Sequence, residues 1–565
     1  MKKPVIITVI IMLLYSTSMF AQQTFQNVTS SMGIYGQTGL GHAVGWGDID
    51  NDGDPDLGIS NQEGDGFWFY LNEGDDFTNI TSSAGLSNLG GNKIIIAEMT
   101  GDEFNDLVLR TRSGTQYLFE SNGDGTFNNI SAASGITSAA VYGLADFDND
   151  GTTDLISVAG DYISILYNNG DATFSPAENI ALMPDFFGVT TLDYDRDGLM
   201  DIYWTTYGDS PNTLLKNNGD GTFTDVTIVA GVSYTEGGHA LDVGDFNNDG
   251  WIDIYVGSYS SLNCALFKNN GDGTFTDVAT TTGTSGNHDT RTSTFIDYDN
   301  DGWLDIFSSH HDFYSYSNTM LRNNGDNTFT ETAVSLGISG EWIGDYFGVG
   351  WADYNLDGAV DLFAAGHIDK YRLFKNNNNP GNYLSVYLQG IESNPNGIGA
   401  QVVVWVDGNM ISRNMLADGG FHDFSDLHLS FGLANATVVD SIIIYWPSGI
   451  VQEIGNVNAN QFITIIEDES VGVDESETII CYSPTIFKPN PTNDKGTLVF
   501  SQESKSLVNI SLINSKGNLT KVLLNKVLDR GTHELNIDVS KLQSGVYYIK
   551  IVNSCNSEVV RVVIY

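Results

Sequence analysis

The sequence predicts an all-β chain, with a seven-bladed β-propeller followed by two small β-rich domains. Two observations lead to this prediction. A nine-residue acidic stretch occurs in six full copies and one altered copy between residues 48 and 361, at intervals of about 50 residues. Short strand-like segments lie between the copies, separated by Asn-Gly and Asp-Gly turns that supply the positive φ angles of tight hairpins. This period with short strands is typical of propeller blades.

The copy at 297–305 shows what the acidic stretch can do. Its sequence is Asp-Tyr-Asp-Asn-Asp-Gly-Trp-Leu-Asp, with carboxylates at positions 1, 3, 5 and 9 and glycine at position 6. Carboxylates this dense repel one another unless a cation neutralises them, and Ca²⁺ accepts six to eight oxygen ligands in flexible geometry. The first six positions match an EF-hand loop, but the glutamate at position 12 and the flanking helices of that motif are missing. We therefore expect a calcium loop between two β-strands.

We number the copies loops 1 to 7 in chain order and their residues positions 1 to 9. The expected side-chain ligands stand at positions 1, 3, 5 and 9. They are Asp48, Asp50, Asp52 and Asp56 in loop 1; Asp146, Asp148, Asp150 and Asp154 in loop 3; Asp193, Asp195, Asp197 and Asp201 in loop 4; Asp245, Asn247, Asp249 and Asp253 in loop 5; Asp297, Asp299, Asp301 and Asp305 in loop 6; Asp353, Asn355, Asp357 and Asp361 in loop 7.

Position 7 varies too widely for its side chain to be a ligand, so we expect its backbone carbonyl to bind instead. The residues at this position are Asp54, Thr152, Leu199, Trp251, Trp303 and Ala359. Asp-rich turns also form without metal, and a single copy would leave both interpretations open. Six copies with fixed spacing favour calcium, at about six ions per chain.

Loop 2 departs from the pattern. Glu98, Thr100, Asp102 and Asp106 occupy its ligand positions, and Glu103 replaces the glycine. We expect this loop to hold no metal.

The ends of the repeat region indicate how the ring closes. The seventh unit ends at 373–379 without the Gly-Thr-Phe strand that follows the other units, whereas the first unit begins with an additional strand-like segment at 24–29. We expect this N-terminal strand to complete the last blade, because the ring then has no free sheet edge.

Two motifs identify the repeats with a known family. The segment 244–254 reads Gly-Asp-Phe-Asn-Asn-Asp-Gly-Trp-Ile-Asp-Ile, and 269–275 reads Asn-Asn-Gly-Asp-Gly-Thr-Phe. Both resemble the FG-GAP/VCBS repeats of integrin α-chain propellers and of many exported bacterial proteins. The resemblance implies a calcium-bearing propeller over 22–379. It implies no particular ligand, because propellers have many functions.

The rest of the chain resembles two further families. Residues 380–467, with Asn-Gly-Ile-Gly-Ala at 396–400 and Trp-Pro-Ser-Gly at 446–449, resemble the ASPIC/UnbV domain that often follows such propellers. An acidic linker spans 468–480. Residues 481–565 resemble the C-terminal sorting domain of cargo for the type IX secretion system of Gram-negative bacteria. That resemblance implies the secretion machinery as a partner and removal of the tail after export.

Location and charge limit the possible functions. Residues 1–21 have the charged start and apolar centre of a signal peptide, and no later segment is apolar enough to span a membrane. The net charge of −47 argues against binding to nucleic acid or anionic lipid. We expect a protein that is secreted or held on the outer surface of a Gram-negative bacterium.

The sequence carries no catalytic signature. It has no His-Glu-x-x-His, Gly-x-Ser-x-Gly, Cys-x-x-Cys or phosphate loop, so we expect no catalytic residues and no organic cofactor. Two irregular aromatic segments, 310–316 and 342–347, are candidates for binding a glycan or protein ligand, with packing between blades as the alternative. We expect a non-catalytic binding or adhesion module. The alternative is a polysaccharide lyase or hydrolase built on a calcium-binding propeller.

Overall fold

The computed structural model describes most of the chain after residue 23. The described ranges are 24–35, 41–61, 66–74, 76–102, 104–111, 114–136, 140–183, 185–207, 210–259, 263–286, 289–310, 317–339, 348–366, 371–377, 381–417, 423–468, 480–482, 486–488, 495–502, 506–514, 519–528, 531–542, 544–552 and 557–564. The expected signal peptide, the aromatic segments 311–316 and 342–347, and Glu103 of loop 2 lie outside the described residues.

Seven antiparallel sheets, which we call blades 1 to 7, follow one another in the described part of the chain before residue 377. Their strands, from the ring centre outward, are β2 (Gly41–Gly47), β3 (Asp56–Asn61), β4 (Phe67–Asn72) and β5 (Phe77–Asn79); β6 (Lys93–Ala97), β7 (Asp106–Arg110), β8 (Gln116–Ser121) and β9 (Phe127–Asn129); β10 (Ala140–Ala145), β11 (Asp154–Ala159), β12 (Tyr162–Leu166) and β13 (Glu178–Leu182); β14 (Phe186–Leu192), β15 (Asp201–Thr206), β16 (Thr213–Asn217) and β17 (Phe223–Asp225); β18 (Gly238–Gly244), β19 (Asp253–Ser258), β20 (Ala265–Asn269) and β21 (Phe275–Asp277); β22 (Thr290–Ile296), β23 (Asp305–His310), β24 (Thr319–Asn323) and β25 (Phe329–Glu331); β26 (Gly348–Ala352), β27 (Asp361–Ala365), β28 (Tyr371–Asn376) and β1 (Phe25–Asn27).

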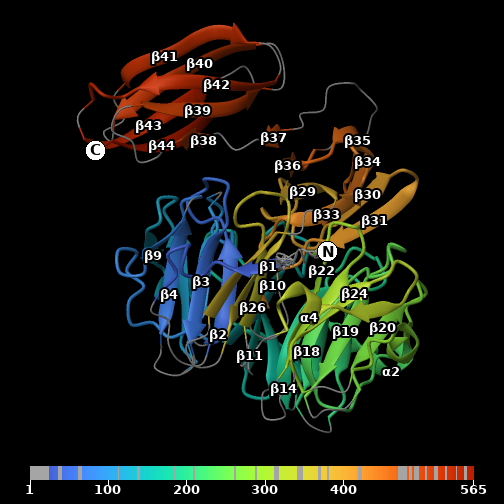
Figure 1. Cartoon of the computed structure of the whole chain (residues 1–565). Helices are drawn as coiled ribbons and strands as arrows, with labels where there is room; N and C mark the ends of the chain where they lie inside the picture. Colours follow the sequence, from blue (N-terminus) through green and yellow to red (C-terminus); the bar gives the residue numbers. More distant parts are fainter. Residues whose placement is uncertain are drawn as a thin grey trace, which may run out of the picture.

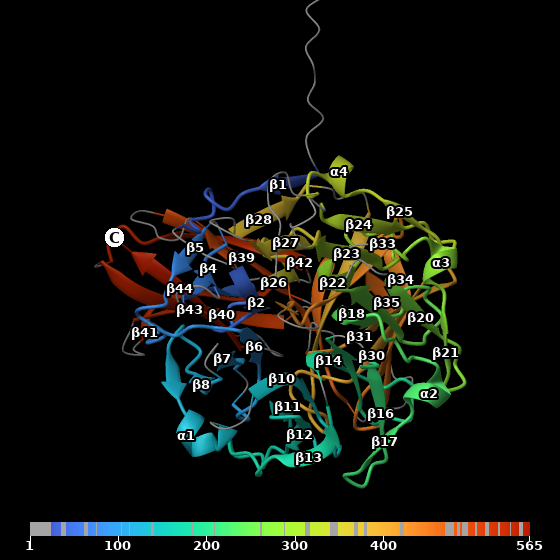
Figure 2. The same ribbon diagram turned by 90° about the horizontal axis from the view of Figure 1, so that it is seen from below.

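The blades surround a common centre (Figure 2). Their innermost strands contact one another, for example β2 with β6 and β26. Small residues make this close packing possible: a methyl group added at Gly45 of β2 would lie 2.5 Å from a methyl carbon of Ile94 in β6. Each loop connects the innermost strand of its blade to the second strand, so the loops gather at one end of the ring.

Ring closure follows the expectation from the sequence. The N-terminal strand β1 pairs with β28, with Phe25 opposite Asn376 and Asn27 opposite Phe374. Phe25 also packs against Trp351 of the same blade, with ring centroids 6.2 Å apart. The first strand of the described chain therefore completes the last blade.

Short helical turns follow the outer strands of four blades and were not predicted. They are α1 (Ser131–Ser134), α2 (Thr227–Ala230), α3 (Ala279–Thr282) and α4 (Ala333–Leu336). The segment 223–227, Phe-Thr-Asp-Val-Thr, has the composition of a strand, but β17 ends at Asp225. The Asp225 carboxylate accepts hydrogen bonds from the amide and the hydroxyl of Thr227, and this turns the chain into α2.

The second domain consists of two four-stranded sheets around a shared core. Its strands are β29 (Asn382–Gln389), β30 (Gln401–Val406), β31 (Asn409–Asn414), β33 (Leu429–Ala434), β34 (Val438–Tyr445), β35 (Val451–Asn458), β36 (Gln461–Ile466) and β37 (Ile480–Tyr482). Strand-like segments at 383–388, 400–406, 427–431, 441–445 and 461–466 predict β29, β30, β33, β34 and β36, whereas β31, β35 and the short β37 were not predicted.

The C-terminal domain has its own core, which includes Leu498, Ile510 and Ile549. Its strands are β38 (Ile486–Lys488), β39 (Lys495–Gln502), β40 (Ser506–Asn514), β41 (Leu519–Leu528), β42 (Gly531–Asp538), β43 (Gly545–Val552) and β44 (Ser557–Ile564). They form the sheets β38-β39-β42 and β41-β40-β43-β44.

The second domain lies on the loop end of the ring (Figure 1). One of its segments reaches the ring centre, where β32 (Asp423–Phe424) pairs in parallel with β2 of blade 1. The next residue, Ser425, binds the amide of Trp351 in blade 7 through its hydroxyl. A cavity of about 190 Å³ remains between the two domains and is lined by residues that include Asp242, Thr294 and His428.

Candidate metal centres

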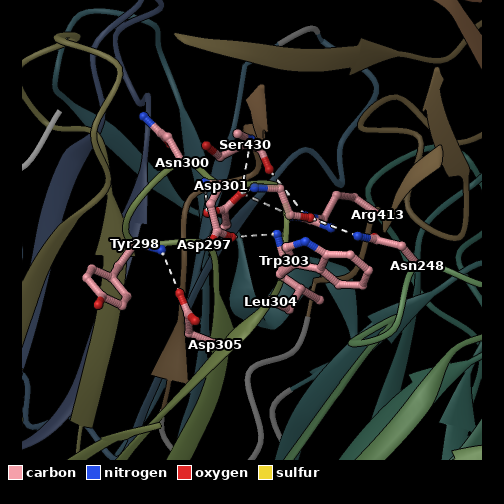
Figure 3. A network of polar contacts seen from close by, with 12 residues as sticks. Asn248, Asp297, Tyr298, Asn300, Asp301, Trp303, Leu304, Asp305, Arg413 and Ser430 are labelled. Atoms are coloured by element: carbon pink, nitrogen blue, oxygen red, sulfur yellow. Dashed lines mark hydrogen bonds and ion pairs between the residues drawn. The ribbon is translucent and has the colours of Figure 1, made fainter. Parts of the chain in front are cut away.

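Loop 6 shows the geometry that the full loops share (Figure 3). The Asp297 carboxylate accepts hydrogen bonds from the amides of Asp301, at 3.1 Å, and Gly302, at 2.9 Å. The amide of Trp303 donates to Asp301 Oδ1 over 3.0 Å. Asn300 at position 4 and Gly302 at position 6 have φ angles of 54° and 92°, the left-handed region that Asn and Gly tolerate best. The backbone therefore curls around position 1 and brings the other carboxylates toward it.

Both carboxylate oxygens of the residue at position 9 accept hydrogen bonds from backbone amides. Asp305 Oδ2 accepts from the amide of Tyr298 at 3.3 Å, and Oδ1 accepts from Asn323 in the third strand at 2.7 Å. Asp305 is completely buried. Each carboxylate oxygen has about two acceptor sites, so one remains on each oxygen for a cation.

Four loops hold three carboxylates whose oxygen atoms lie within 4.8 Å of one another. These groups are Asp48, Asp50 and Asp56; Asp146, Asp148 and Asp154; Asp193, Asp195 and Asp197; Asp297, Asp299 and Asp305. Loops 5 and 7 have Asn247 and Asn355 at position 3, so an amide oxygen takes the place of one carboxylate there. The grouping brings together side chains that the sequence proposed as ligands.

Two further observations fit a hard cation such as Ca²⁺. Asp299 is 8% exposed, and its Oδ1 is buried with no hydrogen-bond partner, as is Asp195 Oδ1. A buried carboxylate oxygen without a partner is costly unless a cation binds it. The Trp251 side chain at position 7 of loop 5 packs on the turn glycine Gly271 of its own blade, which leaves its backbone carbonyl as the candidate ligand.

The electrostatics of position 1 agree with this interpretation. Burial raises the pKa of the position 1 carboxyls, and nearby carboxylates raise it further. The resulting pKa is about 6 at Asp146, Asp193 and Asp245, and about 7 at Asp48, Asp297 and Asp353. A bound divalent cation would favour the charged form and reverse these shifts. Without a cation, the loops resist carrying their full charge at neutral pH.

Loop 2 uses its glutamate differently. Glu98 Oε1 accepts hydrogen bonds from the amides of Thr100, at 2.8 Å, and Asp102, at 3.2 Å. The longer side chain thus satisfies the loop amides itself. The described residues of loop 2 form no close group of three acidic side chains. That this loop binds no metal stays a prediction.

An asparagine at the end of the third strand links adjacent blades, and sequence reasoning missed it. In blade 6, Asn323 Nδ2 donates to the carbonyl of Leu304 over 3.1 Å and to the carbonyl of Phe246 in blade 5 over 2.8 Å. The same pair of contacts is made by Asn72, Asn168, Asn217, Asn269 and Asn376. The sequence feature that could have revealed this link is the first asparagine of the recurring Asn-Asn-Gly-Asp-Gly segment.

The second domain binds loop 6 directly. The amide of Gly432 donates to Asp297 Oδ2 over 3.0 Å, and Arg413 Nη2 lies 3.5 Å from the same oxygen. Arg413 also donates to the carbonyl of Gly302 over 3.3 Å, and the amide of Ala434 donates to the carbonyl of Asn300 over 3.0 Å. The second domain therefore covers the loop and shares a carboxylate with the candidate metal site.

The opposite end of the ring carries a group of aromatic and basic side chains, which we call the mouth group. Its members are Phe187, Tyr207, His239, Tyr259 and Arg291. The Tyr207 and Tyr259 ring centroids are 4.7 Å apart, the His239 and Tyr259 rings stack at 5.0 Å, and the Arg291 guanidinium lies 5.0 Å from the centre of the Tyr259 ring. Tyr207 is 48% exposed. His239 is buried, as is His42 of β2.

These features define an all-β propeller with acidic metal-binding-type loops at one end of its ring. The family models agree with the sequence analysis. FG-GAP-like repeats match residues 146–204, 193–256, 245–308 and 297–364; the ASPIC and UnbV domain matches 390–472; and a secretion system C-terminal sorting domain matches 486–565. The chain is therefore an FG-GAP-repeat propeller protein with an ASPIC/UnbV domain and a sorting domain. The sorting domain indicates a protein that is secreted or displayed on the cell surface.

Two relatives match part of the chain. Cartilage acidic protein 1 of Xenopus tropicalis is 32% identical over 27% of this chain and 24% of its own length. The human protein is 27% identical over 42% of this chain and 37% of its own length. The chain thus spans well under half of these relatives.

Two solved structures resemble the chain at low similarity. A lectin of Agrocybe aegerita that recognises non-reducing terminal N-acetylglucosamine has a TM-score of 0.36 at 20% identity, covering 60% of this chain and 92% of the lectin. The biofilm matrix protein Bap1 of Vibrio cholerae has a TM-score of 0.29 at 12% identity, covering 96% and 76%. Within the described residues, the structure contains no helix long and apolar enough to cross a membrane.

Proposed function

We propose that this protein is an exported binding or adhesion module, that calcium stabilises its propeller, and that it performs no catalysis. The proposal rests on a difference between the two ends of the ring, one of which is covered and the other partly exposed. The second domain covers the loop end, through contacts such as Gly432 to Asp297. The other end carries the mouth group, in which Tyr207 is half exposed. Ligand binding is assigned to this second end.

Calcium has a structural role in this proposal. The oxygens of positions 1, 3, 5 and 9 and the carbonyl of position 7 would hold the ion, at about six sites per chain. The ion would supply the positive charge that offsets carboxylate repulsion. Each loop then holds two strands of its blade in place, and the ring gives the mouth group a rigid support.

The mouth group suits a glycan or a protein segment. Its aromatic rings offer flat apolar surface, and tyrosine hydroxyls, His239 and Arg291 add hydrogen-bonding groups. His310 begins the first aromatic segment proposed from the sequence, and Gly348 directly follows the second. Thr290 and Gly348 are the first residues of the innermost strands β22 and β26, at the end of the ring that carries the mouth group. Thr290 pairs with His310, and Gly348 pairs with Ala365, so His310 and Gly348 both lie at this end.

The non-catalytic role is supported by the interdomain cavity. At about 190 Å³ it is smaller than the roughly 300–1,000 Å³ of typical ligand pockets, and it lies under the second domain. The sorting domain supports the proposed place of action. We assign the protein to the outside of a Gram-negative bacterium, either secreted or held on the outer surface, and reached through the type IX secretion machinery.

The test is a glycan and protein array probed with the wild-type protein, Tyr207→Ala and Tyr162→Ala. Tyr162 is also exposed but lies outside the mouth group, so it is the matched control. Tyr207→Ala should weaken binding roughly tenfold or more, as truncation of a central aromatic contact does, and Tyr162→Ala should not. Any glycan that binds is then incubated with the protein. New reducing ends or unsaturated products would replace this proposal with the lyase or hydrolase alternative.

A further inference from the structure

One position of the third strand differs among the blades. Each third strand contains one residue whose backbone amide donates a hydrogen bond to Oδ1 of position 9, so this residue identifies the equivalent place in every blade. The position that differs is the one immediately before it. The donors are Asn72, Ser121, Asn168, Asn217, Asn269, Asn323 and Asn376. The residues before them, in blade order, are Leu71, Glu120, Tyr167, Lys216, Lys268, Arg322 and Lys375. Blades 4 to 7 therefore carry a basic residue where blades 1 and 3 carry an uncharged one.

These basic side chains reach the candidate metal ligands of their own blades. Lys216 contacts Asp195 and lies 2.7 Å from Asp197, at positions 3 and 5 of loop 4. In loop 6, Arg322 Nε lies 2.6 Å from Asp299 and Nη2 lies 2.6 Å from Asp301.

The same contact occurs in the other two blades. Lys268 Nζ is 2.5 Å from Asp249, and Lys375 Nζ is 2.9 Å from Asp357. In each of the four loops, the basic side chain of the third strand contacts a carboxylate that the calcium ion would also need.

The balance of acidic and basic side chains also differs between loops 1 and 3 and the later loops. Loop 1 has five aspartates, including Asp54, and loop 3 has four, with Leu71 and Tyr167 at the third-strand position. Loops 5 and 7 have three aspartates each, with one lysine against them. Loop 6 has four aspartates with Arg322 and the buried Arg413 against them. Calcium affinity depends on the number of charged ligands and on the rigidity of the site.

We propose that the six full loops form two classes of calcium site, and that the third-strand residue sets the class. Loops 1 and 3 bind Ca²⁺ more tightly. Loops 4 to 7 bind it more weakly, because the ion must displace Lys216, Lys268, Arg322 or Lys375 from its carboxylates or share them with it. In the absence of calcium, the basic side chain partly neutralises its loop. Blades 4 to 7 therefore depend less on calcium than blades 1 and 3.

Loop 5 allows a measurement at a single site, since position 7 is a tryptophan only in loops 5 and 6. A tryptophan beside a bound Tb³⁺ transfers excitation to it, so terbium luminescence in a Trp303→Phe background reports loop 5 through Trp251. Lys268→Met should tighten terbium binding, and calcium competition against it, roughly twofold to fivefold, the size expected for a partly exposed ion pair. Lys268→Arg keeps the charge and should leave the affinity near that of the wild type.

A second measurement covers the whole chain. Native mass spectrometry at rising free Ca²⁺ should show two ions bound before the rest, and Leu71→Lys should remove one of these two. Unchanged or weaker terbium binding by Lys268→Met would overturn the proposal, as would six equal sites in the wild type. If Lys268→Met does not fold, Lys375→Met is tested by the same mass titration.

This inference rests on the calcium binding in the proposed function, and the two can fail separately. A protein that binds no calcium at any concentration contradicts both. A protein that binds six ions with one affinity contradicts only the division into two classes.

Discussion

The amide of Gly432, in the second domain, donates a hydrogen bond to Asp297 Oδ2, in loop 6 of the propeller, over 3.0 Å. One carboxylate thereby serves both the candidate metal site and the interface between the domains. Arg413 lies 3.5 Å from the same oxygen and is buried. The state of loop 6 and the docking of the second domain are therefore physically linked.

Gly432→Ala should weaken this docking. A methyl group at this position would lie 2.4 Å from Asp297 Oδ2 and 2.3 Å from the backbone of Asn300, so the two domains must shift apart. Overpacking of this kind typically costs about 1–3 kcal/mol. Limited proteolysis should cut the variant faster at the interface, and denaturant unfolding should show the loss of stability. Gly455→Ala is the control, because its nearest neighbour would be 3.7 Å away. Equal behaviour of the two variants would contradict the structural role of this contact.

Removal of calcium should lower the melting temperature strongly. At free Ca²⁺ of about ten times Kd each site adds roughly 1.4 kcal/mol, and six such sites add about 8 kcal/mol, comparable to the whole stability of many domains. Thermal melts in EDTA, followed by readdition of Ca²⁺ or Mg²⁺, measure the effect. Mg²⁺ should restore little, because it requires tight octahedral geometry.

Single-site variants provide the control for this melt. Asp301→Ala in loop 6 should cost about one site's share of the calcium stabilisation. Asp102→Ala in loop 2 should change the calcium response little, because Glu98 already satisfies the amides of that loop. An unchanged melting temperature in EDTA, with the metal shown to be gone, would mean that the loops are not structural calcium sites.

The loops could be predicted from the sequence because their geometry is local. In loop 6, the hydrogen bonds from Asp301 and Gly302 to Asp297 join residues four and five positions apart. The strands on either side follow from alternation and turn signals at short range. Ring closure could be predicted from the order of the strand-like segments alone. The seventh unit lacked a strand at 373–379, and the first unit had an additional strand at 24–29.

The contacts that were missed join residues far apart in the chain. The link from Asn323 to Phe246 spans 77 residues, and the parallel pairing of Val44 with Asp423 joins the first blade to the second domain. This pairing explains why the strand expected at 427–431 begins only at Leu429: the residues before it enter the ring centre. The mouth group likewise depends on the assembled blades and has no local sequence signal.

The sorting domain predicts processing of the C-terminus. Its family resemblance implies removal after export, and its core is separate from those of the other domains. The mature protein from its native host should therefore lack most residues after about 477. Intact mass and C-terminal peptide mapping measure this, with whole-cell precursor as the reference. A mature protein that ends at Tyr565 would contradict the prediction.

Without calcium, stability should fall as the pH rises through the window from about 4 to 7. Burial and neighbouring carboxylates raise the pKa of Asp146 to about 6 and that of Asp48 to about 7, whereas an aspartate in an unfolded chain has a pKa near 3.9. Within this window the folded protein binds more protons than the unfolded chain, so raising the pH favours unfolding. The protein in EDTA should thus melt at a higher temperature at pH 5 than at pH 7.5.

Calcium should change this dependence, because the ion binds deprotonated carboxylates. Its effect on the melting temperature should be small at pH 5 and large at pH 7.5. Asp146→Asn should raise the melting temperature in EDTA at pH 7.5 and reduce the gain from calcium. Asp440→Asn changes the net charge equally at an exposed strand position and should do neither, which separates the loop from general charge repulsion. A melting temperature in EDTA that rises from pH 5 to pH 7.5 would show that the loop carboxylates are not strained by their own charge, and relief of carboxylate repulsion would then not be the reason that the loops bind calcium.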